Sequence, residues 1–265
     1  MALAGVLAGI RMPFYPLIPA AGLVCSAAWI ILRKRQGRTV LAAVCALFLF
    51  AGALYGAVSA HPPLPGAAGK GRVTAVAGEE ETALRHFGDS LTPLLCEDLR
   101  DKRLLDVGSG AGFPGLPLLL AEPGLHLTLL DSQGKRVRFL EELCARLGVE
   151  AECLQARAEE QALLPGYRES FDVVTSRAVA RLSLLGELCV PFLKVGGCFL
   201  AMKAEDCGEE LEEARPGLGT LGGKVEAIRE FTVGETRRKI LVIRKVRPTP
   251  KGYPRKYARM VKKPL

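Results

Sequence analysis

From Arg103 onward, short apolar runs are separated by longer segments that are compatible with helices. The predicted elements are a strand beginning near Arg103, strands at 125–130, 149–155, 171–176 and 197–202, and helices at 135–147 and near 182–192. Strands that alternate with helices at this spacing indicate a parallel sheet with helices on both faces. We therefore expect an α/β fold with a Rossmann-like sheet.

Two later apolar runs, Val225 to Val233 and Lys239 to Lys245, follow each other too closely for a helix to lie between them. They must pair as an antiparallel hairpin, because parallel neighbours need a long crossover connection. A parallel α/β sheet that closes with an antiparallel strand is the architecture of S-adenosylmethionine-dependent methyltransferases. A dehydrogenase does not require this C-terminal hairpin.

The N-terminal part of the chain has a different pattern. Two almost uncharged apolar runs, 14–32 and 39–60, contain 19 and 22 residues, and each is long enough to cross a bilayer. A basic loop, 33–38, separates the two runs, and the Pro-rich stretch 61–66 links them to the remainder.

Three interpretations of this apolar helical segment, residues 1–70, stay open: a membrane hairpin with contact through residues 14–60, a buried pair of helices, or an artefact of the gene model. The positive-inside tendency would keep the basic loop of a hairpin in the cytoplasm and place both of its ends outside. That topology conflicts with an enzyme that uses a cytoplasmic cofactor. We expect residues 71–265 to form a cytoplasmic domain with a basic C-terminal tail.

Between the apolar segment and the sheet, the sequence predicts a helix from Glu79 to Leu91. Its polar residues are Arg85, His86, Asp89 and Ser90. We interpret these residues as capping groups and as a solvated helix face.

Charge is distributed unevenly along the chain. Residues 1–70 contain six basic residues and no acidic ones, 71–235 contain 18 basic and 28 acidic residues, and 236–265 contain 12 basic residues and no acidic ones. An acidic body with a basic C-terminal segment indicates a polyanionic partner that the tail contacts. A solvated strand edge with a lysine-rich end is the alternative.

Cysteine and histidine do not suggest metal chemistry. The chain has eight cysteines without a Cys-x-x-Cys pair, and only three histidines. This usage is typical of the reduced, buried thiols of an intracellular protein. We expect neither a metal site nor a His-based catalytic triad.

The most informative stretch is the glycine-rich loop after the strand that begins near Arg103. Glycines at 108, 110, 112 and 115 precede a helix-compatible segment, as in nucleotide-cofactor sites. The last three form the pattern Gly-x-Gly-x-x-Gly, which also occurs in dinucleotide-binding sites. Asp106 favours S-adenosylmethionine because the methionine part of that molecule carries an ammonium, and Asp131 follows at about the spacing of a ribose-binding carboxylate. A glycine-rich surface turn is the alternative without a ligand.

Taken together, the motifs of residues 72–265 resemble the bacterial ribosomal RNA small subunit methyltransferase G (GidB) family, which methylates N7 of a guanine in 16S rRNA. The matching stretches are Arg85–Leu91, Leu105–Gly115, Leu130–Ser132 with Lys135–Leu140, Ser176–Ala180 and Tyr253–Lys256. Two departures are Arg72, where the family usually has Asn, and residues 1–70, which replace an amphipathic helical N-terminus.

The resemblance implies an S-adenosylmethionine-dependent enzyme whose partner is 16S rRNA or the small ribosomal subunit. Family contacts to the cofactor carry over to Gly108, Phe113, Ala158, Glu159 and Arg177. Gly110 of the loop and Asp131, the candidate ribose-binding carboxylate, are added to these. The candidate cofactor-binding residues are therefore Gly108, Gly110, Phe113, Asp131, Ala158, Glu159 and Arg177. A surface ion pair is the other interpretation of Glu159 and Arg177.

The chemistry needs little from side chains, because guanine N7 carries an in-plane lone pair and reacts without deprotonation. We expect no dedicated catalytic base. The expected phosphate contacts are Arg237, Arg238, Lys239, Lys251, Arg255, Lys256, Arg259, Lys262 and Lys263. For Tyr253 and Tyr257, packing competes with stacking on bases.

Two other functions stay open from the sequence. The Gly110, Gly112 and Gly115 pattern suits an NAD-dependent oxidoreductase, although no proton donor is recognisable. The apolar N-terminal segment and the basic tail would also suit a membrane-anchored RNA-binding protein without catalysis.

Overall fold

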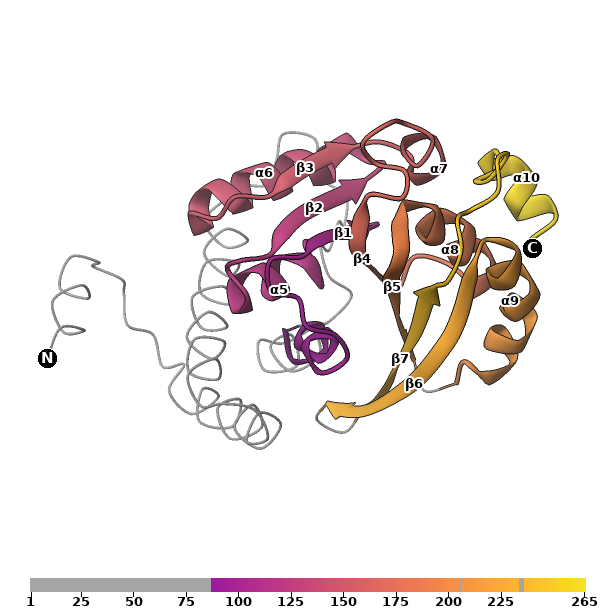
Figure 1. Cartoon of the computed structure of the whole chain (residues 1–265). Coiled ribbons are helices and arrows are strands. Elements are labelled where there is room, and N and C mark those ends of the chain that lie inside the picture. Colours follow the sequence, from indigo (N-terminus) through magenta and orange to yellow (C-terminus); the bar gives the residue numbers. More distant parts are fainter. Residues whose placement is uncertain (1–86, 205, 234–235) are drawn as a thin grey trace, which may run out of the picture.

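A seven-stranded sheet forms the centre of the computed structural model, which describes residues 87–204, 206–233 and 236–265 (Figure 1). The strands are β1 (Arg103–Val107), β2 (His126–Asp131), β3 (Glu152–Gln155), β4 (Phe171–Arg177), β5 (Leu193–Ala204), β6 (Gly223–Val233) and β7 (Thr236–Lys245). Their order across the sheet is β3-β2-β1-β4-β5-β7-β6.

The first five strands are parallel, and β7 is antiparallel to both β5 and β6. The predicted parallel sheet with an antiparallel C-terminal hairpin is therefore confirmed. From β1 the chain first adds strands on one side and then crosses over to β4 on the other. Open α/β sheets bind ligands at such a switch point, outside the carboxyl ends of the strands.

Helices precede the first strand, connect most of the later strands and follow the last one. They are α4 (Asp89–Leu91), α5 (Gly115–Ala121), α6 (Gly134–Leu147), α7 (Ala158–Gln161), α8 (Leu182–Cys189), α9 (Gly208–Thr220) and α10 (Tyr257–Lys262), with 3-10 turns η3 (Thr92–Leu95) and η4 (Val190–Phe192). The helix predicted near 182–192 ends at Cys189 and continues as η4. Pro191 explains this change, because proline cannot donate the backbone hydrogen bond that continues an α-helix.

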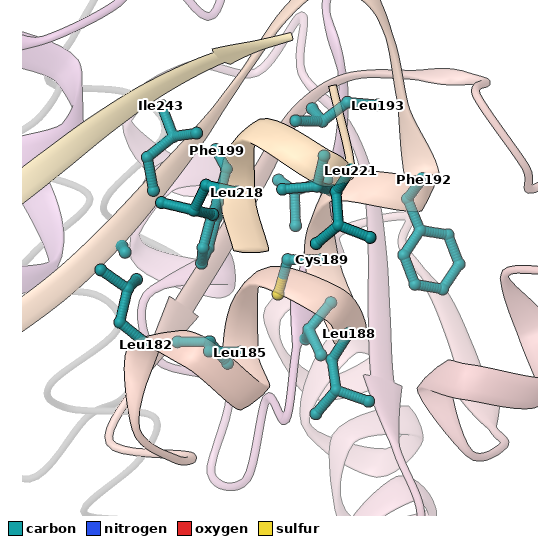
Figure 2. Close-up of a cluster of buried hydrophobic side chains, with 14 of the residues drawn as sticks. Leu182, Leu185, Leu188, Cys189, Phe192, Leu193, Phe199, Leu218, Leu221 and Ile243 are labelled. Carbon is teal, nitrogen blue, oxygen red and sulfur yellow. The ribbon is translucent and has the colours of Figure 1, made fainter. Parts of the chain in front are cut away.

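Alternation along the strands produces two apolar layers. Leu104 and Val173 face the layer that contains α5 and α6, whereas Leu105 and Val174 face the opposite one. Figure 2 shows the second layer, in which leucines of α8 cluster with Leu218 of α9, Leu221 just after α9 and Phe199 of the sheet. This packing fixes α8, and with it the segment that connects β4 to α8.

Ion pairs hold the basic C-terminal segment against the body. Arg255 Nη2 lies 2.6 Å from Glu187 Oε2 of α8, and Glu187 is only 1% exposed. Buried Lys245 Nζ lies 3.1 Å from Glu169 Oε1 and donates to Thr249 Oγ1 at 2.6 Å. Burial lowers the pKa of Lys245, and the Glu169 carboxylate opposes that shift. The segment is therefore a docked part of the domain.

This docking corrects one prediction. Arg255 was expected to contact phosphate, but its guanidinium donates two hydrogen bonds to Glu187 Oε2 and one to Oε1. A buried carboxylate left without its partner would be costly, so the role of Arg255 is structural.

The predicted apolar runs 14–32 and 39–60, the linker 61–66 and the first part of the helix predicted from Glu79 lie outside the described residues. Among the residues that are described, no helix combines the length and the apolar character needed to cross a bilayer.

Candidate cofactor site

The glycine-rich loop begins where β1 ends at the switch point. Gly108 N and Ser109 N both donate to Leu130 O, at 2.8 and 3.1 Å, which ties the loop to the end of β2. Gly108 has φ +74°, and a Cβ placed there would lie 2.5 Å from Val179 Cγ2. Glycine is therefore required at 108 both by the backbone conformation and by the close approach of the segment after β4.

Asp106 supports the glycine-rich loop through hydrogen bonds to its carboxylate. Its carboxylate is 0% exposed and accepts hydrogen bonds from Gly115 N and Thr175 Oγ1, both at 3.2 Å. Burial raises the pKa of Asp106 to about 6, and these hydrogen bonds limit the rise. The ammonium contact that the sequence suggested for Asp106 is not available to a carboxylate enclosed in this way.

Asp131 and Gly110, two of the candidate cofactor-binding residues, meet at the carboxyl end of β2. Asp131 Oδ2 accepts from Gly110 N at 3.1 Å and lies 3.3 Å from Arg136 Nη1, and Oδ1 accepts from Gln133 N at 2.9 Å. A Cβ on Gly110 would have no atom closer than 3.8 Å, so the loop is open on that side.

Ala158 and Glu159 open α7, directly after β3. Glu159 is buried, and its Oε1 accepts from Arg157 Nε at 2.6 Å. Ala156 N donates to Asp131 O at 3.3 Å, which joins the end of β3 to the ribose-site candidate. Arg157 also stacks on Tyr257 of α10, with Cζ 5.0 Å from the ring centroid.

Arg177 and Phe113 are brought together at the end of β4. The Arg177 guanidinium lies over the Phe113 ring, with Cζ 5.1 Å from the centroid, and Phe113 packs edge-on against Phe87 at 5.1 Å. Arg177 Nη1 donates to Asp89 Oδ2 at 3.3 Å and to Ser90 Oγ at 3.4 Å.

Sequence reasoning missed the part that Asp89 and Ser90 play here. Both were interpreted as capping or solvated groups, whereas both are buried against Arg177. The available signal was their position in Arg85–Leu91, one of the stretches that carry the family resemblance. Their distance in sequence from Arg177 hid the contact.

A cavity of about 530 Å³ opens beside the loop, at the carboxyl ends of β4 and β5. Its wall includes the segment 178–181, in which Val179 also covers Gly108. Lys203 Nζ donates to Ala180 O at 2.8 Å and lies 2.7 Å from Glu210 Oε1, and Glu210 accepts from Leu182 N. This ion pair anchors the segment between the loop and the cavity.

Within the described ranges, no cluster of His, Cys, Asp and Glu is arranged to hold a metal ion. The six cysteines in those ranges are free thiols.

Comparison with known proteins gives consistent matches. The family model for rRNA small subunit methyltransferase G (GidB) matches residues 70–241. Curated proteins named ribosomal RNA small subunit methyltransferase G from Acetivibrio thermocellus and Lactobacillus johnsonii are each 46% identical to this chain, over 201 and 202 residues. The alignments cover 74% of this chain, and 82% and 84% of those proteins.

Solved structures support the fold. A branched-chain polyamine synthase mutein from Thermus thermophilus superposes with a TM-score of 0.53 at 16% identity, over 76% of this chain and 64% of that one. NSun6 from Pyrococcus horikoshii superposes with a TM-score of 0.50 at 18% identity, over 61% of this chain and 52% of that one.

We expect Gly108→Ala to weaken binding of S-adenosylhomocysteine at least tenfold, because the new Cβ would displace Val179 as well as strain the backbone. Isothermal titration calorimetry measures the affinity. The control is Gly148→Ala, which has a similar φ of +64° but open space around the new Cβ. Adding Val179→Ala to Gly108→Ala should restore part of the affinity. Unchanged affinity in folded Gly108→Ala would contradict a site at this loop.

Proposed function

We infer the function from a family assignment: the chain belongs to the rRNA small subunit methyltransferase G family. We propose that it transfers a methyl group from S-adenosylmethionine to N7 of a guanine in 16S ribosomal RNA. The observation that carries the proposal is the glycine-rich loop at the switch point, with Asp131 held against Gly110.

The residues around the loop fit the cofactor. S-adenosylmethionine, when bound, supplies a methyl group activated by the positive sulfur. Gly108 and Gly110 would let the backbone approach it, and Phe113 would provide an apolar wall. Asp131 would accept hydrogen bonds from the ribose hydroxyls, and half-buried Ala158 would leave space for adenine beside Glu159. Arg177 would bind an anionic group of the cofactor.

The target guanine would occupy the cavity at the ends of β4 and β5. A volume of about 530 Å³ is within the range of small-molecule sites and accommodates a nucleobase. Val179 lines the cavity and also contacts the glycine loop, so the two sites share a wall. If the base is stacked or paired in the RNA, it must be flipped out to enter.

The chain would act by positioning and not by acid-base catalysis. N7 has a free lone pair in the plane of the ring, so no proton has to be removed before methyl transfer. The Lys203 and Glu210 ion pair would keep the segment 178–182 in place between base and cofactor. We therefore assign no residue as a general base.

Helix α10 would contribute the RNA contact nearest to the cofactor site. Arg157, which precedes α7, stacks on Tyr257, the first residue of α10. Exposed basic residues lie on either side of Tyr257 in the sequence: Lys256 before it, and Arg259, Lys262 and Lys263 after it. These four belong to the phosphate contacts predicted from the sequence, from which only Arg255 is removed, because it pairs with Glu187. Stacking of Arg157 on Tyr257 also favours packing as the role of Tyr257.

The remaining organisation follows from this reaction. We propose that 71–265 forms a cytoplasmic methyltransferase domain, because its substrate is ribosomal RNA. The apolar segment 1–70 would be separate from catalysis. A membrane contact through 14–60 would be compatible with this location only if the basic loop 33–38 lay on the opposite side of the bilayer, against the positive-inside tendency.

We expect N7-methylguanine as the product when the full chain is incubated with labelled S-adenosylmethionine and either 16S rRNA or small subunits from cells that lack the endogenous activity. A site without a general base suits methylation of a ring nitrogen that has a free lone pair. Nucleoside analysis by mass spectrometry identifies the product. Methyl groups only on a 2′-hydroxyl, an exocyclic amine or a pyrimidine carbon would contradict the proposal.

We expect Asp131→Ala to weaken S-adenosylhomocysteine binding by one to two orders of magnitude, because a hydrogen bond to a charged acceptor contributes about 1.5–3 kcal/mol. The 2′-deoxyribose analogue separates ribose recognition from loop support. It should bind more weakly than S-adenosylhomocysteine to the unmodified protein and equally well to Asp131→Ala. The control is exposed Asp98→Ala. A persistent preference for the ribose form in Asp131→Ala would remove Asp131 from ribose recognition.

Neutralising Lys256, Arg259, Lys262 and Lys263 should make the slope of log affinity for RNA against log salt shallower by about 3, because each phosphate contact contributes roughly 0.7–0.9. Filter binding at several salt concentrations measures the slope. A charge-matched control neutralises Arg100, Lys102, Arg138 and Arg146, which lie before β1 and on α6. Equal slopes for the two variants would show that α10 has no special role.

A further inference from the structure

Asp89 connects the segment in front of the sheet to the end of β4. Asp89 is 6% exposed, and its Oδ2 lies 3.3 Å from Arg177 Nη1. Arg177 is itself 15% exposed in its side chain. The pair joins residues 88 positions apart in sequence, at the edge of the glycine loop.

The two side chains depend on each other electrostatically. Burial lowers the pKa of Arg177 and raises the pKa of Asp89, and the opposite charge of the partner counters each shift. Removing either partner would leave a charge in a poorly solvated place. A neutral residue at 89 would therefore favour a rotamer that carries the guanidinium toward solvent.

The position of the guanidinium is also defined by aromatic contacts. It lies over the ring of Phe113, with Cζ 5.1 Å from the centroid, and Phe113 is part of the glycine loop. Phe87 supports that ring from the same segment as Asp89. The acidic and aromatic residues before the sheet thus hold both the guanidinium and the surface on which it lies.

The local charge favours an anion as the ligand. Arg238 Nε lies 4.0 Å from Asp89 Oδ1, so a single carboxylate faces two guanidiniums. Asp106 also attracts Arg177, but its carboxylate is enclosed and already accepts from Gly115 N and Thr175 Oγ1. The planar fork of arginine matches the geometry of a carboxylate.

We propose that Asp89 is a positioning residue that holds Arg177 over Phe113 to bind the carboxylate at the methionine end of the cofactor. This inference rests on the proposed function. In it, Asp89 acts through Arg177 and does not touch the ligand. An RNA phosphate is the competing anion. Binding of a cofactor analogue measured in the absence of RNA distinguishes the carboxylate from the phosphate.

The test compares S-adenosylhomocysteine with its decarboxylated analogue by calorimetry on the full chain. The unmodified protein should prefer the carboxylate form at least tenfold. Asp89→Asn and Arg177→Gln should each reduce that preference to less than threefold, and Asp89→Asn should add nothing in the Arg177→Gln background. Asp89→Glu, which keeps the charge, should retain most of the preference.

The matched control is Asp172→Asn, which neutralises an ion-paired aspartate at the opposite end of β4, 2.8 Å from Lys194. It should keep the full preference, whatever it does to the melting temperature. Equal weakening of both ligands in Asp89→Asn would indicate a merely structural role and overturn the inference.

An undiminished preference for the carboxylate ligand in folded Asp89→Asn, or in Arg177→Gln, would also overturn the inference. If Asp89→Asn does not fold, the preference measured in Arg177→Gln is the test. Loss of RNA affinity with an unchanged ligand preference would assign the pair to phosphate, against the inference. Failure of the unmodified protein to bind S-adenosylhomocysteine would instead refute the proposed function, and this inference with it.

Discussion

The enclosed carboxylate of Asp106 joins three elements that have to meet for a ligand site to exist at this switch point. It lies on β1, accepts from the first residue of α5 through Gly115 N, and accepts from β4 through Thr175 Oγ1. Since a buried carboxylate needs donors, any movement of the loop that withdrew Gly115 would remove one of these two hydrogen bonds from an enclosed group, which is costly. The turn from strand to helix is thereby fixed before a ligand binds.

Around Asp106, the site is built from pairs of residues that connect the ends of the strands to one another. Asp131 joins the end of β2 to Gly110, and Val179 after β4 covers Gly108. Lys203 and Glu210 fix the same segment from the side of the cavity. Such preorganisation suits a reaction in which the nucleophile needs no base, because positioning is then the main contribution of the protein.

The C-terminal segment extends this arrangement toward a polyanionic partner. Arg255 and Lys245 are bound internally, to Glu187 and Glu169, and so serve to dock the segment. The exposed lysines and arginines of α10 are then presented on a fixed surface, close to Arg157 and the start of α7. A docked surface loses less conformational entropy on binding than a free tail does.

The sequence by itself determined the α/β alternation, the antiparallel hairpin, the glycine-rich loop and the family, because these depend on local periodicity and on motifs of adjacent residues. It also marked Asp131 as a candidate ribose-binding residue from its spacing, while the hydrogen bond from Gly110 N to its carboxylate came only from the structure. Only the tertiary structure decided which charges pair. Arg177 meets Asp89 across 88 positions, and Arg255 meets Glu187 across 68, and no local pattern encodes either contact. The same physics explains both surprises: once packing removes a guanidinium from water, it must lie beside whichever carboxylate the fold brings within reach.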